Sequence, residues 1–213
     1  MKRHVVSISV LTAMLLFALP SAAQEKNAEK PLKAPQGVKV AAGETSKNVI
    51  EVVDIEPFAY AAVEMTGSYE QHAQAFMALY SAAGQQGLAM TEAPFGIYHN
   101  SPEDTPEEDL KWEIGMPVPG DKELAAPIVL KKWEFTKVIQ RDFEGAIDSD
   151  GMKAVYYGMY EWIGANGYEL AGPMMERFLS MPSANEKGEM VGKVQIVFPV
   201  QKKISAPSGV KID

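Results

Sequence analysis

The chain has 213 residues, of which 46% are hydrophobic and 23% are charged, so it can form one medium-sized domain or two small ones around a buried core. It contains no cysteine, which excludes disulfides, thiolate nucleophiles, thiolate metal sites and a lipid attached to cysteine. The formal net charge of −8 argues against a nucleic-acid partner, because phosphate binding needs clustered Lys and Arg. Neutral or cationic ligands suit this acidic chain better than anionic ones.

The first 23 residues are typical of a signal peptide. Lys2 and Arg3 precede an apolar run over residues 5–19, and small residues follow it. Three hydroxyl residues interrupt the run, which is also shorter than the roughly 20 residues that a membrane-spanning helix needs. We expect cleavage between Ala23 and Gln24, export to the periplasm or the medium, and no stable membrane span afterwards. The mature chain would carry a formal charge of 18 − 28 = −10.

Residues 24–47 are rich in Lys, Ala, Pro, Gly and Glu, a composition that predicts a flexible tether. The folded domain is expected over residues 48–203, followed by a C-terminal tail of residues 204–213. Within the domain the same order of elements occurs twice, in repeat one at about 48–120 and repeat two at about 127–203.

In repeat one, a strand-like stretch ends at Gly67, and Ser68 with Gln71 has the form of a capping box that begins a helix. Apolar residues recur at helical spacing until Gly84 and Gly87, which indicate the end of the helix. A strand segment, an acidic loop and the alternating strand "LKWEIGMPV" follow.

Repeat two begins with the strand-like "IVLKKWEFTKVIQRDF", and Asp148, Ser149 and Asp150 offer caps for a second helix that ends at Asn166-Gly167. Its expected core face is Met152, Val155, Tyr156, Met159 and Ile163. Glycines and prolines recur at a spacing of about 80 residues between the repeats. These patterns predict an α+β fold in which duplicated β-α-β-β units form a pseudo-two-fold antiparallel-sheet domain with a central ligand groove.

Four segments occur in an order that resembles the GyrI-like small-molecule-binding domains, which also serve as effector-binding domains of AraC-type and MerR-type regulators. They are "GSYEQHAQAFMALYSAAGQQGL", "PFGIYHNSPEDTPEEDLKWEIGMPV", "YEWIGANGYELAGPMMERF" and "GKVQIVFPV", and the resemblance covers roughly residues 50–202. It implies a groove lined by aromatic residues with a buried acid, whose place falls on Glu176. It also implies ligands that are bulky and often cationic or aromatic.

Some free-standing members of that family resemble hydrolases that open cyclopropane rings in toxic natural products. The chain departs from the regulator pattern, because we expect no DNA-binding helix-turn-helix before Asn48 and expect export. Both expectations argue against transcriptional control, and export also argues against action on a cytoplasmic gyrase.

Glu176 is the acid that most needs an explanation. If "GPMMERF" is a strand, Met174, Glu176 and Phe178 share one face, so the carboxyl lies between apolar side chains. Desolvation would raise the pKa of Glu176, leaving either a protonated acid or an ionised one that needs a cation. The alternative is a structural acid at the rim, paired with Arg177 or another base.

Glu113 is the best candidate for a second carboxylate, because two acids can share proton transfer to a leaving group and to water. The alternative is a solvated strand acid, since Lys111 would lie on the same face. Tyr156 fits the core face of the second helix and is interpreted as packing. The expected ligand-binding residues are Glu176, Trp112, Tyr98, Tyr160, Trp162, Phe178 and Met174.

His72 and His99 show no metal-ligand spacing, and no phosphate loop or nucleophile motif occurs, so we predict neither a metal nor a cofactor. The preferred hypothesis is an exported protein that captures a hydrophobic, cationic or aromatic small molecule. The alternative is a hydrolase of strained compounds that uses Glu176 as general acid or base, with Glu113 as a weaker second candidate. A third hypothesis is a protein adaptor whose groove holds a partner segment.

Overall fold

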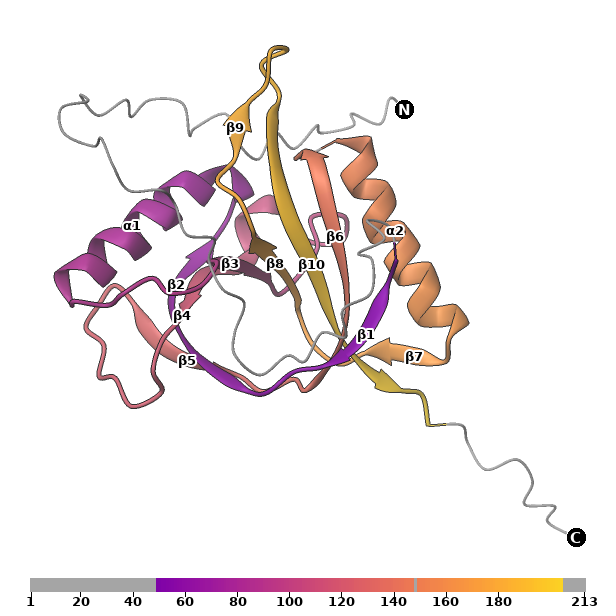
Figure 1. Ribbon diagram of the computed structural model, residues 1–213, viewed down its shortest axis with the longest axis horizontal. Helices are drawn as coiled ribbons and strands as arrows, with labels where there is room; N and C mark the ends of the chain where they lie inside the picture. The colour runs from indigo at the N-terminus through magenta and orange to yellow at the C-terminus, as the bar shows by residue number, and fades with distance from the viewer. Residues whose placement is uncertain (1–48, 148, 205–213) are drawn as a thin grey trace, which may run out of the picture.

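A computed structural model describes residues 49–147 and 149–204 (Figure 1). The predicted signal peptide and tether, and all of the predicted tail except Ile204, lie outside the described residues. The described part is an α+β fold, a mostly antiparallel sheet with two helices, as the sequence predicts.

The sheet contains ten strands. They are β1 (Glu51–Asp54), β2 (Phe58–Thr66), β3 (Phe95–Tyr98), β4 (Lys111–Pro117), β5 (Val129–Trp133), β6 (Lys137–Ala146), β7 (Tyr168–Leu170), β8 (Met174–Phe178), β9 (Ser183–Ala184) and β10 (Met190–Lys202). Their order is β1-β6-β10-β8-β3-β4-β2-β5, and β7 and β9 each pair with β10.

The helices are α1 (His72–Gln85) and α2 (Asp150–Ala165), with short 3-10 turns at η2 (Tyr69–Gln71) and η3 (Glu107–Asp109). Ser68 and Ser149 cap the helical starts by accepting backbone N–H groups at 3.3 and 3.2 Å. Gly87 and Gly167 follow the helices with φ of 65° and 70°, a conformation that glycine adopts without steric cost. Both predicted helices are therefore confirmed. Within the described ranges no helix is long and apolar enough to cross a membrane.

The first strand of each half of the chain pairs with a strand of the other half. β1, at the start of the described chain, pairs with β6 of the second half, whereas β5 pairs with β2 of the first half. At the centre β3 pairs with β8 over four residues, with Gly96 opposite Glu176 and Tyr98 opposite Met174. We call this β3–β8 junction the seam. The central groove and the duplication of the fold stay predictions.

Both helices cover the same face of the sheet. Ile114, Gly96, Glu176 and Ile196 form one row across β4, β3, β8 and β10, and their side chains therefore share a face. Ile114 belongs to the core under α1 and Ile196 to the core under α2. In the view of Figure 1, α1 lies to the left and α2 to the right of the central strands. A third apolar cluster, which includes Met175, lies on the opposite face.

Candidate ligand-binding site

Strand β8 places Met174, Glu176 and Phe178 on the helix-covered face, as the alternation of the sequence predicts. Met174 and Phe178 are partly buried and pack against the cores of both helices, and Phe178 meets Phe76 edge-on at a centroid distance of 5.3 Å. Glu176 is only 9% exposed. The acid therefore lies between the two halves, among apolar side chains.

Arg177 does not form an ion pair with Glu176. As the next residue of the strand it faces the other side of the sheet, where its Nη1 donates to Gln195 Oε1 at 3.2 Å. The alternative of an ion pair between these sequence neighbours is therefore wrong.

Two phenols hold the carboxyl of Glu176. Tyr98 Oη of β3 donates to Oε2 at 3.0 Å, and Tyr156 Oη of α2 donates to Oε1. Each half of the chain thus supplies one phenol, and the acid links β3, β8 and α2. The sequence predicted Tyr98 as a site residue, but Tyr156 was interpreted as packing because it follows the core spacing of α2. Tyr156 does pack on the core under α2, and its hydroxyl, which no helical pattern reveals, also reaches Glu176.

Gly96 makes the Tyr98 contact sterically feasible. It lies directly opposite Glu176 in the strand register, and the Tyr98 ring lies over it. A Cβ added at Gly96 would be 2.7 Å from Tyr98 Oη, closer than real Cβ atoms approach. A glycine two residues before a buried tyrosine was the sequence signal for this arrangement, and it was missed.

His72 extends the network into α1. Its Nε2 lies 2.8 Å from Tyr98 Oη, and its Nδ1 forms a hydrogen bond with the Tyr69 carbonyl oxygen. Burial lowers the pKa of His72 to about 4, although the bond to Tyr69 acts in the other direction. His72 is therefore neutral near pH 7. We call His72, Tyr98, Glu176 and Tyr156 the seam network; the sequence did not single out His72, which carries no motif.

Trp112, an expected ligand-binding residue, lies in the core and contacts this network through His72. It is 1% exposed, stacks on the His72 ring at 4.4 Å, and donates its indole N–H to the Gly67 carbonyl at 3.0 Å. Tyr69 lies beside it, and burial followed by the charge of Glu176 raises the pKa of Tyr69 to about 12. Tyr69 therefore stays a neutral phenol at physiological pH.

The structure does not bring Tyr160 and Trp162 into the seam network. Tyr160 is 47% exposed on α2 and packs on Phe198 of β10 at 4.9 Å. Trp162 stacks on Tyr168 of β7 at 5.8 Å, near the end of the helix. Both were expected as walls of the site. Their contacts place Trp162 in the packing of α2 on β7, while Tyr160 stays on the surface one turn after Tyr156.

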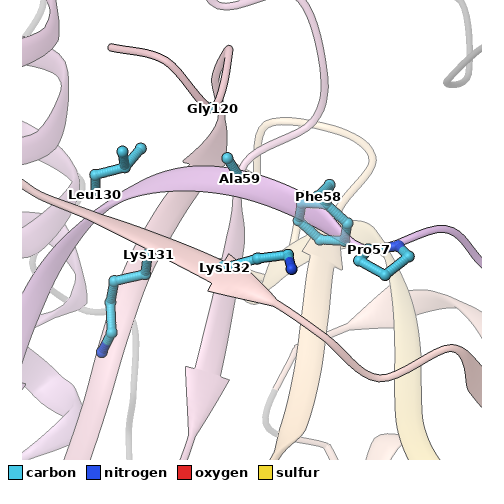
Figure 2. A pocket seen from close by; sticks show the side chains of 7 residues that line it. All are labelled: Pro57, Phe58, Ala59, Gly120, Leu130, Lys131 and Lys132. Atoms are coloured by element: carbon cyan, nitrogen blue, oxygen red, sulfur yellow. The ribbon is translucent and has the colours of Figure 1, made fainter. Parts of the chain in front are cut away.

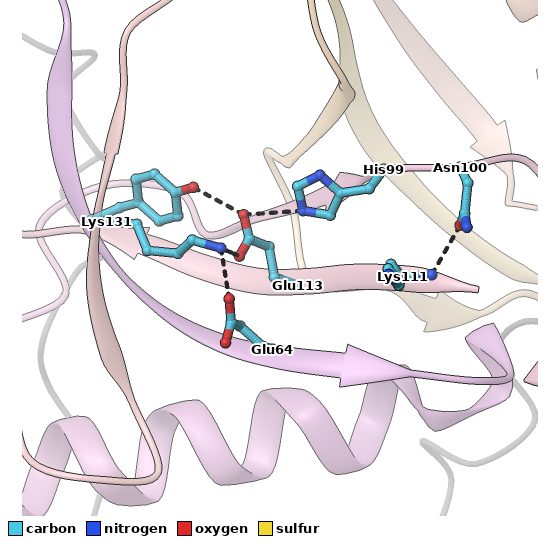
Figure 3. A network of polar contacts seen from close by, with 7 residues as sticks. Glu64, His99, Asn100, Lys111, Glu113 and Lys131 are labelled. Carbon is cyan, nitrogen blue, oxygen red and sulfur yellow. Dashed lines mark hydrogen bonds and ion pairs between the residues drawn. The ribbon is translucent and has the colours of Figure 1, made fainter. Parts of the chain in front are cut away.

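Glu113 lies on the opposite face of the sheet and is not a second carboxylate beside Glu176. Because Trp112 faces α1, the alternation of β4 directs Glu113 the other way. It is 1% exposed and not solvated, which also excludes the alternative of a surface acid. It is bound by Tyr60 at 2.9 Å, Lys131 at 2.5 Å and His99 at 3.5 Å. Figure 3 shows the Lys131 and His99 side chains directed toward Glu113.

These contacts fix the charge of Glu113. Burial alone would raise its pKa, but hydrogen bonds from His99, Lys131 and Tyr60 outweigh burial and lower it. Partial burial of Lys131 is likewise outweighed by its bonds to Glu113 and Glu64, which raise the pKa of the lysine. The result is an ionised carboxylate with a permanent ammonium partner. We call Tyr60, His99, Glu113 and Lys131 the opposite-face network.

A hollow of about 510 Å³ lies at the β2–β5 edge (Figure 2). Its lining residues are Pro57, Phe58, Ala59, Gly120, Leu130, Lys131 and Lys132. The two lysines are engaged with acids, Lys131 with Glu113 and Glu64, and Lys132 with Glu134 at 3.0 Å. None of the expected site residues lines this hollow, so it is separate from the seam.

Solved structures with the same fold include EcmrR and two proteins from Listeria innocua. EcmrR in its complex with DNA is 17% identical with a TM-score of 0.61, and the match covers 73% of this chain but only 58% of EcmrR. A conserved protein from Listeria innocua is 14% identical, with a TM-score of 0.57 and 71% and 92% of the two chains covered. A hydrolase from Listeria innocua is 12% identical, with a TM-score of 0.54 and 74% and 94% covered.

At these identities the likenesses show the fold alone. A comparison with curated protein sequences finds no match. The family model of the GyrI-like small molecule binding domain, however, matches residues 49–201, which include every element from β1 to β9 and nearly all of β10. With a small-molecule-binding fold, a buried acid at its centre and this match over most of its length, the chain belongs to the GyrI-like small-molecule-binding domain family.

Proposed function

We propose that the protein captures a hydrophobic cation, of planar aromatic character, between α1 and α2 over strand β8. The observation that carries this proposal is the Glu176 carboxyl, buried to 9% exposure and held by phenol hydroxyls among Met174 and Phe178. A carboxylate in such surroundings attracts a positive charge strongly, because little water screens it. The neighbouring rings suit a cation, which binds favourably to aromatic faces.

The Tyr156–Glu176 bond defines how a ligand would enter. It ties α2 to β8, so a ligand that reaches the acid replaces this phenol as its partner. Tyr156 is half-buried and Tyr160 is exposed one turn further along α2. Movement of this one helix turn opens the approach to Glu176 without disturbing the pairing of β3 and β8.

The amino-terminal pattern supports export as part of the proposal. Lys2 and Arg3 followed by an apolar run and small residues are what a signal peptidase substrate requires. A protein exported in this way would meet its ligand outside the cytoplasm. Expression of the full chain, followed by cell fractionation and amino-terminal sequencing, tests this; an uncut cytoplasmic product would contradict it.

Hydrolysis is a second candidate, and one contact favours it. His72 lies 2.8 Å from Tyr98 Oη, and Tyr98 in turn contacts Glu176, so the acid has a hydrogen-bonded path for a proton. A carboxylic acid that can be reprotonated is able to act as a general acid on a strained ring. Glu113 does not take part in this candidate reaction, because it lies on the other face of the sheet.

A thermal-shift screen of the full chain separates these functions. Cationic dyes, neutral dyes of similar size and cyclopropane-bearing compounds are tested on the wild type, on Glu176→Gln and on Glu113→Gln. Capture predicts that cationic dyes raise the melting temperature of the wild type and of Glu113→Gln but not of Glu176→Gln.

Mass spectrometry of the incubated cyclopropane compounds completes the screen. Ring-opened product formed by the wild type and lost in Glu176→Gln would establish hydrolysis instead of capture. If no compound shifts the wild type and no ring-opened product forms, both small-molecule functions are contradicted, and the hypothesis of a bound partner segment remains.

A further inference from the structure

A loop of the first half reaches helix α2 of the second half. It comprises residues 99–110 between β3 and β4, and we call it the acidic loop because it carries Glu103, Asp104, Glu107, Glu108 and Asp109. Glu103 Oε1 accepts a hydrogen bond from Tyr157 Oη of α2 at 2.8 Å. The acidic loop therefore joins the two halves at the surface, as Tyr98 and Glu176 join them inside.

The acidic loop has a fixed base beside the seam network. The Asn100 side chain closes the loop by accepting from the Lys111 backbone N–H at 2.9 Å. Tyr69 Oη donates to the Asn100 carbonyl oxygen at 2.8 Å, and the Tyr69 ring packs edge-on against Tyr98 at a centroid distance of 5.2 Å. The loop thus starts at the seam and presents Glu103 to α2 from there.

One turn of α2 is held on two sides. Tyr156 and Tyr157 are neighbours on this helix and point in different directions, because successive residues turn by about 100°. Tyr156 donates to Glu176 inside, and Tyr157, which is 54% exposed, donates to Glu103 outside. The charge of Glu103 also acts on Tyr160, whose pKa is raised by burial first and by this charge second. The carboxylate of the acidic loop therefore lies along the turn that covers the acid of the seam.

Entry of a ligand at Glu176 requires this turn to move. Displacement of the turn that carries Tyr156 also displaces its neighbour Tyr157, so the bond to Glu103 breaks when the site opens. An exposed contact with a charged group is weak, about a factor of three in an equilibrium. Such a contact can be made and broken in every binding cycle.

We propose that the Glu103–Tyr157 bond is a latch that holds the empty site closed, and that a cation opens it more readily than a neutral molecule does. The inference rests on the proposed capture of a cation at Glu176. Glu103 is an exposed carboxylate among the acids of its loop, so a positive charge is attracted there before it reaches the seam. A cation that pairs with Glu103 competes with the Tyr157 hydroxyl and releases the turn. A neutral molecule enters only when the bond breaks spontaneously.

Two dyes of similar shape test the latch by stopped-flow fluorescence on the full chain, the cation 10-methylacridinium and the neutral 9-methylanthracene. Tyr157→Phe removes the hydroxyl of the latch but keeps the exposed ring. Because the bond is made only in the empty protein, its loss should raise the association rate and the affinity of both dyes about threefold and leave the dissociation rates unchanged. A merely packing role of Tyr157 predicts weaker binding or no change, and either result would overturn the latch.

Glu103→Gln separates the charge from the bond. The glutamine carbonyl still accepts from Tyr157, so the neutral dye should enter at nearly the wild-type rate. The cation loses its first partner and should associate about threefold more slowly. Glu108→Gln is the matched control, because it removes the same charge from the acidic loop while the Glu103–Tyr157 bond remains. Equal slowing of the cation in both variants would assign its preference to the overall charge of the loop and overturn the role of Glu103.

Hydrogen exchange tests the latch without any ligand. In the dye-free protein the amides of residues 156–160 should exchange about threefold faster in Tyr157→Phe than in the wild type, and at the wild-type rate in Glu108→Gln, because the latch opposes local opening of this turn. Equal exchange in Tyr157→Phe and the wild type contradicts the latch. Dye binding with unaltered rates in Tyr157→Phe also removes the latch while leaving capture intact. If neither dye binds the wild type, capture itself is contradicted, together with selective opening by a cation.

Discussion

Two carboxylates lie buried on the central strands of one sheet, and their surroundings differ in kind. Glu113, at 1% exposure, is bound by the Lys131 ammonium, Tyr60 and His99. Glu176, at 9%, is bound by the phenols of Tyr98 and Tyr156, one from each half of the chain. A buried acid with a built-in cation is a structural ion pair. An acid held by phenols from both halves, at the junction between them, is suited to a ligand that contacts both halves.

The largest expected effect comes from removing the charge at the seam. Glu176→Gln keeps the shape of the side chain but loses the carboxylate. The affinity for the planar cationic dye 10-methylacridinium should therefore fall about 100-fold, the loss typical of a buried charged partner. Fluorescence titration measures it. Equal losses in Glu176→Gln and Glu113→Gln would remove the functional distinction between the two acids.

The same two variants should have the opposite order of effects on stability. Glu113→Gln leaves Lys131 without its buried partner and should lower the free energy of unfolding by about 2 kcal/mol, measured by urea denaturation. Glu176→Gln should change it by less than about 1 kcal/mol, because glutamine still accepts from a phenol. A larger stability loss in Glu176→Gln than in Glu113→Gln would reverse the assignment of roles.

Acid titration should show that Glu113 contributes to stability in its ionised form. The pKa of Glu113 is lowered in the folded state, so its contribution to stability is present above its unfolded pKa and is lost as the pH falls through the folded one. The wild type should therefore lose stability more steeply than Glu113→Gln below about pH 4.5. Urea midpoints collected along a pH series measure both slopes. Parallel curves would mean that Glu113 has no altered pKa.

Gly96→Ala should have a smaller effect, confined to the seam. The new methyl group displaces Tyr98 from Glu176, because its position is 2.7 Å from the hydroxyl oxygen. We expect about tenfold weaker binding of 10-methylacridinium, roughly the value of one hydrogen bond to a charged group. Gly164→Ala is the control, since a Cβ there meets nothing within 4 Å. Unchanged binding in Gly96→Ala would show that Tyr98 has no part in the site.

The smallest expected effect is that of Tyr156→Phe. It removes one donor to Glu176 but leaves the ring and its packing, and a ligand replaces this donor in any case. We expect a change in dye affinity of about threefold or less, measured in the same titration. A loss as large as that of Glu176→Gln would mean that Tyr156 remains bound to the acid in the complex.

The strand and helix pattern was readable from the sequence because it depends on local periodicity. The period of two in "MMERF" correctly predicted the shared face of Met174, Glu176 and Phe178, and the glycines at 87 and 167 correctly predicted the helix ends. Contacts between distant segments were not readable in this way. No local signal tells that Lys131 reaches Glu113, or that Tyr156 turns its hydroxyl to Glu176.

Which face of a strand meets the helices also depends on tertiary packing. In β4 the alternation of Trp112 and Glu113 was clear, but either face suited a site until the stacking of Trp112 on His72 decided it. His72 was overlooked because a single buried histidine has no spacing to mark it. The sequence pattern placed Glu176 between apolar side chains and named Tyr98 beside it, but it assigned Tyr156 only to packing and did not single out His72.

The pairing of each first strand with the other half has a consequence for how the chain reaches this state. β1 cannot pair until β6 exists, since Glu51 meets Gln140, and the first half lacks its edge strand until β5 has been made. Contacts this distant in sequence slow folding, because a long loop must close before they form. During synthesis the edge of β2 therefore stays unpaired until β5 has been made, and an unpaired sheet edge is prone to wrong pairing. The seam, which takes Tyr98 from one half and Glu176 from the other, forms only when nearly the whole domain has emerged.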